Sequence, residues 1–310
     1  MHQAATSEDI VQIIDQTLGQ LAPAINRLKT QHSSFRFAAC GSTALAVQAA
    51  ILDSRNESGW LMQSLGDYQE IRHSLDPGTA VIGISLSGHS VEVREVLNQA
   101  AADGISAIFV SLGTSIESAH NLLIGPTEIP QRFLPLLAMR FVQFCLGSAF
   151  PEKDISSQQI HPVELSVLLQ EFLVKTYQAE LMPVFAAPKP DIKATQLKTQ
   201  YMEFLKRPAI QLIFPEWTHD FLWSLSQADK NRYALILFEP RIDLTDQRFQ
   251  KCVNHIQNLG ISHLVINHSP AQQVPNPNSR IFRQVLDLFQ TLADQLGIDP
   301  SQERSFTSEY

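Results

Sequence analysis

A turn rich in serine and glycine follows the most strand-like segment of this sequence. Residues 79–84 form a continuous apolar run with several β-branched members, typical of a strand buried on both faces. The turn Ser85-Leu86-Ser87-Gly88-His89-Ser90 comes next, and a helical pattern then runs from Val91 to about Ala102. The first turn of a helix has unpaired N–H groups, and its dipole favours an anion. A phosphate group is therefore the ligand that this turn predicts.

The side chains of the turn support the same prediction. Ser85, Ser87 and Ser90 supply hydroxyl donors, and Gly88 allows a positive φ and a close approach of backbone to ligand. Ser87 and Ser90 could instead be simple helix caps, a role that serine commonly has.

A second turn of this kind lies upstream. Residues 35–39 have the pattern of a short strand, and Cys40-Gly41-Ser42-Thr43 follows before a helical segment of small residues over 44–52. In an open parallel sheet, both turns would lie at the carboxyl ends of strands, which is where ligands bind. Two such turns favour a ligand site over a pair of ordinary helix caps.

The two common nucleotide-binding motifs are missing. Neither strand is followed by the G-x-G-x-x-G of dinucleotide-binding proteins, and no Gly-Lys-Ser/Thr of a P-loop is present. The net charge of −8 also argues against a general attraction to nucleic acid or to an anionic membrane. Any anion must therefore be held by a local arrangement of donors.

Composition indicates an ordinary globular protein. The chain has 310 residues, of which 44% are hydrophobic and 17% charged, enough for two domains with real cores. Cys40, Cys145 and Cys252 show no C-x-x-C spacing and fit reduced thiols. The N-terminus has no apolar signal core, and the apolar stretch 133–150 is interrupted by Arg140 and too short to span a bilayer. That stretch predicts a buried helix or a subunit contact, and the whole predicts a cytoplasmic protein.

Strand and helix patterns alternate along the chain after an opening amphipathic helix over 7–30. In the first half, strands are expected at 35–39, 79–84 and 107–112, with a weaker element near 60–62 and helices at 44–52, 91–102 and 130–146. In the second half, strands are expected at 181–187, 209–214, 232–238 and 262–266, with helices at 192–205, 217–228, 246–259 and 279–296. Such alternation predicts an α/β fold with two parallel-sheet domains in tandem, 1–155 and 162–310, joined by a polar linker at 151–161.

Two segments resemble a known family. Val81-Ile82-Gly83-Ile84-Ser85-Leu86-Ser87-Gly88-His89-Ser90-Val91-Glu92 is similar to the G-x-S-x-S-G-x-T-x-E signature of SIS (sugar isomerase) domains, and Ala39-Cys40-Gly41-Ser42-Thr43 to their upstream C-G-[ST]-S/T turn. The resemblance covers approximately residues 5–305. It points to double-SIS proteins such as the isomerase domain of glucosamine-6-phosphate synthase, tagatose-6-phosphate isomerases and fructosamine-6-phosphate deglycases. It implies two tandem SIS domains, each a parallel sheet flanked by helices in a three-layer αβα sandwich.

The resemblance also assigns roles to individual residues. It implies that Thr43, Ser85, Ser87 and Ser90 contact the phosphate, within the turn that Gly88 shapes, and that Ser42 contacts the neighbouring sugar.

In SIS isomerases a glutamate on the first helix of the second domain precedes a histidine, and here Glu203 stands sixteen residues before His219. By resemblance, Glu203 moves a proton between C1 and C2 of the sugar and His219 opens the sugar ring. The family's histidine often serves the partner subunit's site, which implies a homodimer. Taken alone, Glu203 could be a solvated helix residue, and His219 a residue hydrogen-bonded near the start of a helix.

The sequence departs from the family pattern at four places. Gly125-Pro126-Thr127-Glu128 is not followed by the usual T-K-x-[FW], and Ala186-Ala187-Pro188-Lys189-Pro190 replaces the usual glycine-rich turn of the second domain. Ser308 stands where a lysine that can form a Schiff base would be, and Gln200 replaces the lysine three residues before the catalytic glutamate of synthase-like members. A serine cannot form an imine, so ligand binding survives these changes more easily than catalysis does.

Two functions are therefore expected. The first is a phosphosugar isomerase or amino-sugar-phosphate deglycase that needs neither metal nor nucleotide and transfers protons through Glu203 and His219. The second is a non-catalytic sugar-phosphate-binding protein that senses or sequesters its ligand. His255, His263 and His268 lack carboxylates at ligand spacing and are expected to be ordinary polar residues, not a metal site.

Overall fold

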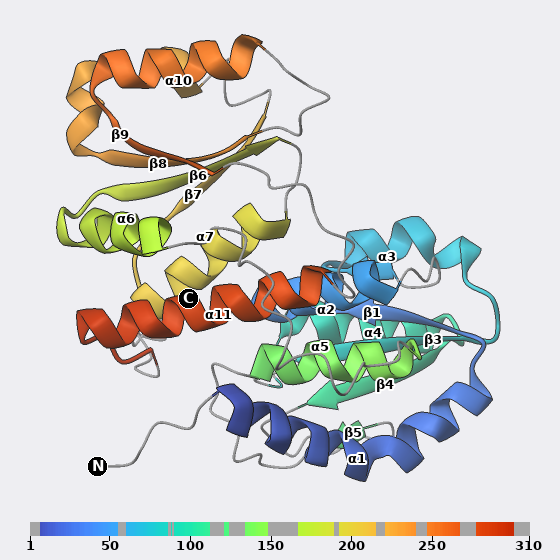
Figure 1. The fold of residues 1–310 in the computed structure, drawn as a ribbon. Helices are drawn as coiled ribbons and strands as arrows, with labels where there is room; N and C mark the ends of the chain where they lie inside the picture. Colours follow the sequence, from blue (N-terminus) through green and yellow to red (C-terminus); the bar gives the residue numbers. More distant parts are fainter. Residues whose placement is uncertain are drawn as a thin grey trace, which may run out of the picture. The chain divides into compact units, whose positions relative to one another are not determined.

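The computed structural model describes residues 7–54, 60–85, 88, 90–111, 121–123, 134–147, 167–188, 192–214, 221–239, 247–266 and 277–300. The chain divides into two compact units, Met1–Phe150 with Pro275–Arg283, and Pro151–Val274 with Gln284–Tyr310. Within the described residues, each unit contains a parallel sheet flanked by helices, so the predicted α/β fold of two tandem sheets is confirmed (Figure 1).

The first unit is built on a sheet whose strand order reverses in the middle. Its described strands follow the order β2 (Trp60–Met62), β1 (Ser34–Ala38), β3 (Thr79–Ser85), β4 (Ser106–Ser111) and β5 (Asn121–Leu123), all parallel. Helix α2 (Gly41–Ser54) connects β1 to β2 in one direction, whereas α4 (Val91–Ala102) connects β3 to β4 in the other. Right-handed crossovers in opposite directions place α2 and α4 on opposite faces. The reversal between β1 and β3 is the topological switch point, the place where open α/β sheets bind ligands.

Both faces of this sheet are covered. Helix α3 (Leu65–Ile71) packs with α4, while α5 (Leu134–Cys145) packs with both α2 and α1 (Ser7–Gln31). The α3/α4 face contains a core whose buried side chains come from the strands and from those two helices: Ala38, Met62, Tyr68, Val81, Val93, Val96, Leu97, Ala100 and Phe109. Helix α3 was not predicted. It begins with a capping box in which the Ser64 side chain accepts from the Asp67 N–H and the Asp67 carboxylate accepts from the Ser64 N–H.

Helix α5 is the apolar stretch singled out in the sequence, and it is a buried helix of the first unit. Arg140 is only 6% exposed and lies 3.6 Å from the Asp15 carboxylate of α1. Desolvation lowers the pKa of Arg140 to about 10, and Asp15 partly offsets this effect. Of the helices described, none is both long and apolar enough to cross a membrane.

The second unit repeats the same plan. Its described strands follow the order β7 (Ile210–Phe214), β6 (Met182–Pro188), β8 (Tyr233–Phe238) and β9 (Ser262–Ile266), all parallel. Helix α7 (Ile192–Leu205) connects β6 to β7, and α10 (Gln247–Leu259) connects β8 to β9 in the opposite direction. The remaining helices of this unit are α6 (Val167–Gln178), α9 (Phe221–Ser224) and most of α11 (Pro277–Leu296).

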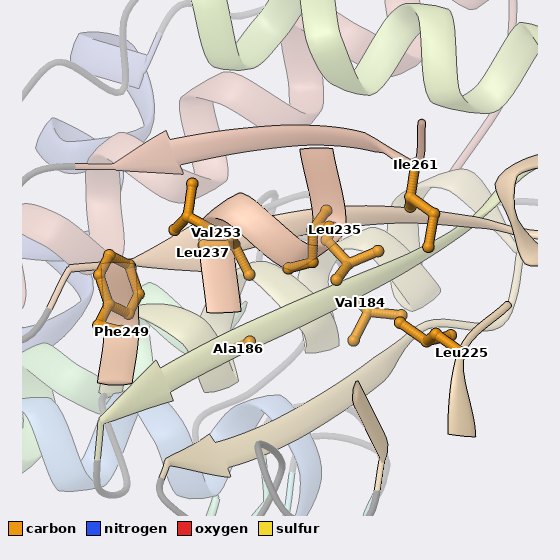
Figure 2. Close-up of a cluster of buried hydrophobic side chains, with 9 residues drawn as sticks. Val184, Ala186, Leu225, Leu235, Leu237, Phe249, Val253 and Ile261 are labelled. Atoms are coloured by element: carbon orange, nitrogen blue, oxygen red, sulfur yellow. The ribbon is translucent and has the colours of Figure 1, made fainter. Parts of the chain in front are cut away.

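Alternating residues of β6 face two different cores. Val184 and Ala186 belong to a cluster with Leu235 and Leu237 of β8, over which Phe249 and Val253 of α10 pack (Figure 2). Phe185, which points to the opposite face, meets Tyr201 of α7 edge to face, and Tyr201 meets Phe289 of α11 in the same way. A strand buried on both faces explains the continuous apolar pattern of its sequence.

One predicted helix of this unit is wrong in its described part. A single helix was expected over 217–228, but α9 ends at Ser224 and a separate 3₁₀ turn spans Gln227–Asn231. Ser226 adopts an extended backbone, with φ −128° and ψ 173°, and its N–H and hydroxyl both donate to the Asp229 carboxylate. This capping box starts a new turn because it satisfies the Ser226 N–H outside any helix.

Helix α11 is anchored at its start to the first unit. The Asp53 carboxylate, at the end of α2, accepts from the backbone N–H and side-chain amide of Asn278 at 3.0 and 2.9 Å, and from the Ser279 N–H at 2.7 Å. The buried Gln143 amide of α5 donates to the Ser279 hydroxyl at 2.7 Å. The bonds to Asp53 satisfy N–H groups in the first turn of α11. Together with the Gln143 bond they attach the start of α11 to the first unit, to which Pro275–Arg283 belong. The predicted domain boundaries, 1–155 and 162–310, stay predictions.

Candidate functional site

The two predicted turns follow neighbouring strands at one edge of the first sheet. Strands β1 and β3 pair in parallel, with Ala38 opposite Gly83, so the segments that follow them both leave the sheet at the carboxyl ends of its strands. Each turn contains a glycine with a left-handed backbone, Gly41 at φ +59° and Gly88 at φ +73°. Other residues adopt such φ values at a cost, which explains glycine at these two positions.

Ser85 and Ser90 are joined across the second turn. The Ser85 hydroxyl is 2.9 Å from the Ser90 hydroxyl, and the Ser90 N–H donates to Ser85 Oγ at 3.4 Å. Ser90 occupies the N-cap position of α4, yet its side chain makes no capping hydrogen bond to the helix. The alternative of a simple cap is therefore wrong for the Ser90 side chain. Since that hydroxyl is turned toward Ser85, it leaves the first N–H groups of α4 to another acceptor.

The two serines consequently differ in what they offer a ligand. Ser85 is 1% exposed and holds the turn through its hydrogen bonds to Ser90, whereas Ser90 is half-buried at the start of the helix. Ser87 lies outside the described residues.

Sequence reasoning missed a cation in this turn. The Arg94 guanidinium donates through Nη2 to the Gly88 carbonyl oxygen at 2.6 Å. A helical side chain points back toward the helix start, so an arginine four residues after the N-cap reaches the turn. That spacing was the signal that could have found it. Arg94 holds the backbone of the turn and brings a positive charge to it.

Gly83 has a packing role beneath the same turn. A Cβ at this position would lie 2.6 Å from Leu97 Cδ1 and 2.7 Å from Val93 Cγ1, both on α4. Real Cβ atoms do not approach so closely, so the absence of a side chain lets α4 lie directly on β3. The start of α4 is thereby fixed relative to Ser85.

The first turn contains Ser42 and Thr43, the other residues predicted to contact the ligand. The Cys40 carbonyl accepts from the Ala44 N–H at 3.3 Å, which places Ser42 and Thr43 in the first turn of α2. Ser42 is half-buried and Thr43 is buried.

Ser111 is a further hydroxyl at this edge that sequence reasoning missed. It ends β4, pairs with Ser85 and so shares a sheet face with it. Its Oγ is buried and has no hydrogen-bond partner among the residues that the structure describes. In the sequence, the one pattern that could have pointed to Ser111 is its place at the end of a third strand, after those that end before the two turns.

The predicted proton-transfer residues belong to the second unit. Glu203 is half-buried in the last turn of α7, before the amino end of β7. His219 comes after the carboxyl end of β7 and, like Ser308, lies outside the described residues. In the described ranges, no group of three or more histidine, cysteine or acidic side chains could hold a metal ion. The His263 ring nitrogen Nδ1 is 3.0 Å from the Ile261 carbonyl oxygen, as expected of an ordinary polar residue.

Comparison with known proteins gives a likeness in fold. No protein-family model and no curated protein matches the sequence. A candidate phosphosugar isomerase from Clostridium difficile 630 is similar in structure, with a TM-score of 0.59 and 13% identity over 98% of this chain and 97% of that one. A candidate sugar-binding protein from Salmonella typhimurium LT2 has a TM-score of 0.57 and 16% identity, over 93% of this chain and 97% of that one. The C-terminal domain of glucosamine-fructose-6-phosphate aminotransferase from Francisella tularensis has a TM-score of 0.51 and 13% identity, over 95% of this chain and 99% of that one.

The matches extend over nearly the whole chain and both of its sheets. The tandem α/β fold that the SIS resemblance implied is confirmed, and this chain shares that fold with these structures.

Proposed function

We propose that this chain binds a phosphorylated sugar, with the phosphate at the start of α4. The observation that carries the proposal is the pair Ser85 and Ser90, since the N-cap hydroxyl bonds to Ser85 and not to the helix. The free end of the helix dipole, the positive φ of Gly88 and the Arg94 guanidinium all favour a dianion there. The names of the structural neighbours, which mention a phosphosugar isomerase and a sugar-binding protein, support a sugar as the rest of the ligand.

The chemistry proposed for the bound sugar is proton transfer. Aldose–ketose isomerisation and deglycation both need an acid/base to open the ring and a base to move a proton between C1 and C2. We assign the second role to Glu203 and the first to His219. Because these residues lie beyond opposite ends of β7 in the chain, the proposal includes a homodimer in which His219 serves the partner's site. It requires no metal or nucleotide, and it places the protein in the cytoplasm.

A second candidate function is ligand binding without chemistry. Gln200 and Ser308 stand at positions where the resemblance would place lysines, and a neutral amide or a hydroxyl cannot replace an amine. A sensor or sequestering protein needs the phosphate turn but not these amines.

A ligand panel separates these functions. Thermal unfolding would be followed with glucose 6-phosphate, fructose 6-phosphate, glucosamine 6-phosphate, fructosamine 6-phosphate and inorganic phosphate, and each sugar would be tested for turnover. Turnover that is lost in Glu203→Gln and His219→Ala supports the enzyme, whereas stabilisation without turnover supports the binding protein. If no phosphosugar raises the melting temperature and Ser87→Ala does not alter the effect of inorganic phosphate on it, the proposed site is wrong.

A further inference from the structure

Two glutamine side chains of α7 are buried without hydrogen bonds to any residue that the structure describes. Gln196 and Gln200 are both 0% exposed, and the Nε2 and Oε1 atoms of each have no partner among the described residues. A primary amide has two donor hydrogens and an acceptor oxygen, and folded proteins rarely bury such a group unsatisfied. Two such amides on one helix are therefore a feature that needs an explanation.

The two amides share one face of α7 with Glu203. Gln196, Gln200 and Glu203 follow one another at i, i+4 and i+7, a spacing that aligns side chains along one side of a helix. The apolar side of the same helix is distinct, since Tyr201 packs between Phe185 and Phe289. The amides therefore lie on the polar side of α7 that also carries the proposed base.

Elsewhere on this helix a polar group is satisfied. Thr195, next to Gln196 in the chain, accepts a hydrogen bond from the side-chain amide of Gln211 on β7 at 2.8 Å. Missing partners are thus not a general property of the polar groups of α7: among its described residues, the buried side-chain atoms without a hydrogen-bond partner are those of Gln196 and Gln200 and the Tyr201 hydroxyl.

We propose that Gln196 and Gln200 bind the hydroxyl groups of the ligand on which Glu203 acts. An anion would use only their N–H groups and a metal ion only their carbonyl oxygens, so either would leave half of each amide unsatisfied. A hydroxyl group both donates and accepts, and neighbouring hydroxyls of a sugar chain can satisfy both atoms of both amides. This proposal rests on the proposed function and assigns these two residues to recognition of the sugar, apart from its phosphate.

The test replaces each amide with an apolar side chain of similar length. Gln196→Met, Gln200→Met and the double variant would be compared with the wild type by calorimetric titration of the four hexose 6-phosphates and of inorganic phosphate. Each single change is expected to weaken binding of the favoured phosphosugar about tenfold. Binding of inorganic phosphate, which needs only the turn before α4, is expected to stay within twofold. The melting temperature of the ligand-free double variant is expected to rise by about 2–4 °C, since unsatisfied buried amides are removed.

A matched glutamine on the same unit provides the control. Gln211→Met removes a satisfied hydrogen bond to Thr195, so it should lower the melting temperature and leave phosphosugar affinity unchanged.

A sugar that lacks a hydroxyl sharpens the result. The 2-deoxy and 3-deoxy forms of the favoured hexose 6-phosphate would be titrated against the same variants. If Gln200 bonds one of these hydroxyls, the sugar that lacks it should bind the wild type more weakly than the parent sugar does. The same two sugars should bind Gln200→Met with equal affinity, because the bond is already absent in that variant. The inference is overturned if a phosphosugar binds the wild type and the double variant equally well. That result leaves the proposed function standing, whereas a failure of every phosphosugar to bind the wild type refutes the proposed function itself.

Discussion

The hydroxyl of Ser85, at the end of β3, lies 2.9 Å from the hydroxyl of Ser90, at the N-cap of α4. This bond connects a strand end to a helix start between residues five positions apart, and it diverts the Ser90 hydroxyl from capping. A second hydroxyl pair, Ser34 with Thr79 at 2.8 Å, joins β1 and β3 near their other ends. The two pairs are chemically alike, and only the first adjoins the proposed ligand site.

Ser85→Ala should abolish stabilisation by phosphate, because Ser90 then loses the partner that keeps its hydroxyl away from the helix. Ser34→Ala is the matched control. Both changes should cost about 1 kcal/mol of unfolding free energy in the ligand-free protein, as measured by urea denaturation. Only Ser85→Ala should abolish the rise in melting temperature on adding phosphate, and an equal loss of that rise in both variants would contradict the assignment.

Gly83→Ala should disturb the site through packing. The added methyl would meet Leu97 and Val93 at 2.6 and 2.7 Å, so α4 must move, at a cost of about 1–3 kcal/mol. Phosphate affinity should fall with stability, since the helix start moves too. Gly19→Ala in α1 is the control, because nothing lies within 4 Å of its new Cβ and alanine favours a helix. A stable Gly83→Ala protein with unchanged phosphate affinity would show that the close approach is unimportant.

Arg94→Ala should weaken binding of inorganic phosphate roughly two- to fivefold, the effect of a partly screened charge. The difference from the wild type should shrink as salt is raised from 20 to 500 mM, because salt screens the guanidinium. Arg72→Ala removes a cation that lies 3.9 Å from Asp103 and serves as the control. Isothermal titration at several salt concentrations measures both variants, and equal losses would mean that Arg94 acts only through net charge.

Mixed dimers test the shared site. Subunits carrying Glu203→Gln and His219→Ala would be co-expressed with different tags and the heterodimer purified. If His219 serves the partner's site, one of the two sites in the heterodimer keeps both residues, and about half of the wild-type activity returns. If both residues serve their own subunit's site, the heterodimer stays inactive.

Two tyrosines predict a loss of stability at alkaline pH. Burial raises the pKa of Tyr68 and of Tyr201 to about 12, and the hydrogen bond to Asp103 adds to the effect at Tyr68. The unfolded chain releases these protons near pH 10, so the stabilisation is complete below that pH and is lost as pH rises toward 12.

Phenylalanine substitutions separate the two tyrosines at neutral pH. The Tyr68 hydroxyl donates to Asp103 at 3.0 Å, so Tyr68→Phe should cost about 1 kcal/mol at pH 7. The Tyr201 hydroxyl is buried without a partner in the described part of the chain, so Tyr201→Phe should cost nothing or stabilise. Both variants should lose less stability than the wild type between pH 9 and 11 in urea denaturation. An equal cost of the two changes at pH 7 would contradict this account.

Local patterns predicted most elements of the fold. The helix over 192–205, which follows Pro190 in the sequence, was predicted to the residue. The helix predicted from Val91 to about Ala102 ends at Ala102, shortly before Gly104 at a left-handed φ. The short helix α3 was missed, since seven residues hold too few apolar positions for a period to show. The helix expected over 217–228 is interrupted because the bonds between Ser226 and Asp229 compete with a continuous helix.

By itself, the sequence determined the α/β class and the turn of serines and glycine for which phosphate binding is proposed. These depend on neighbours in the chain, whose backbone preferences and hydrogen bonds act over a few residues. Only the tertiary structure decided that Ser90 bonds Ser85, that Arg94 reaches Gly88, and that Gln196 and Gln200 are buried with no partner in the described part of the chain. Which donor meets which acceptor depends on how strands and helices pack, and burial is set by residues far away in the chain.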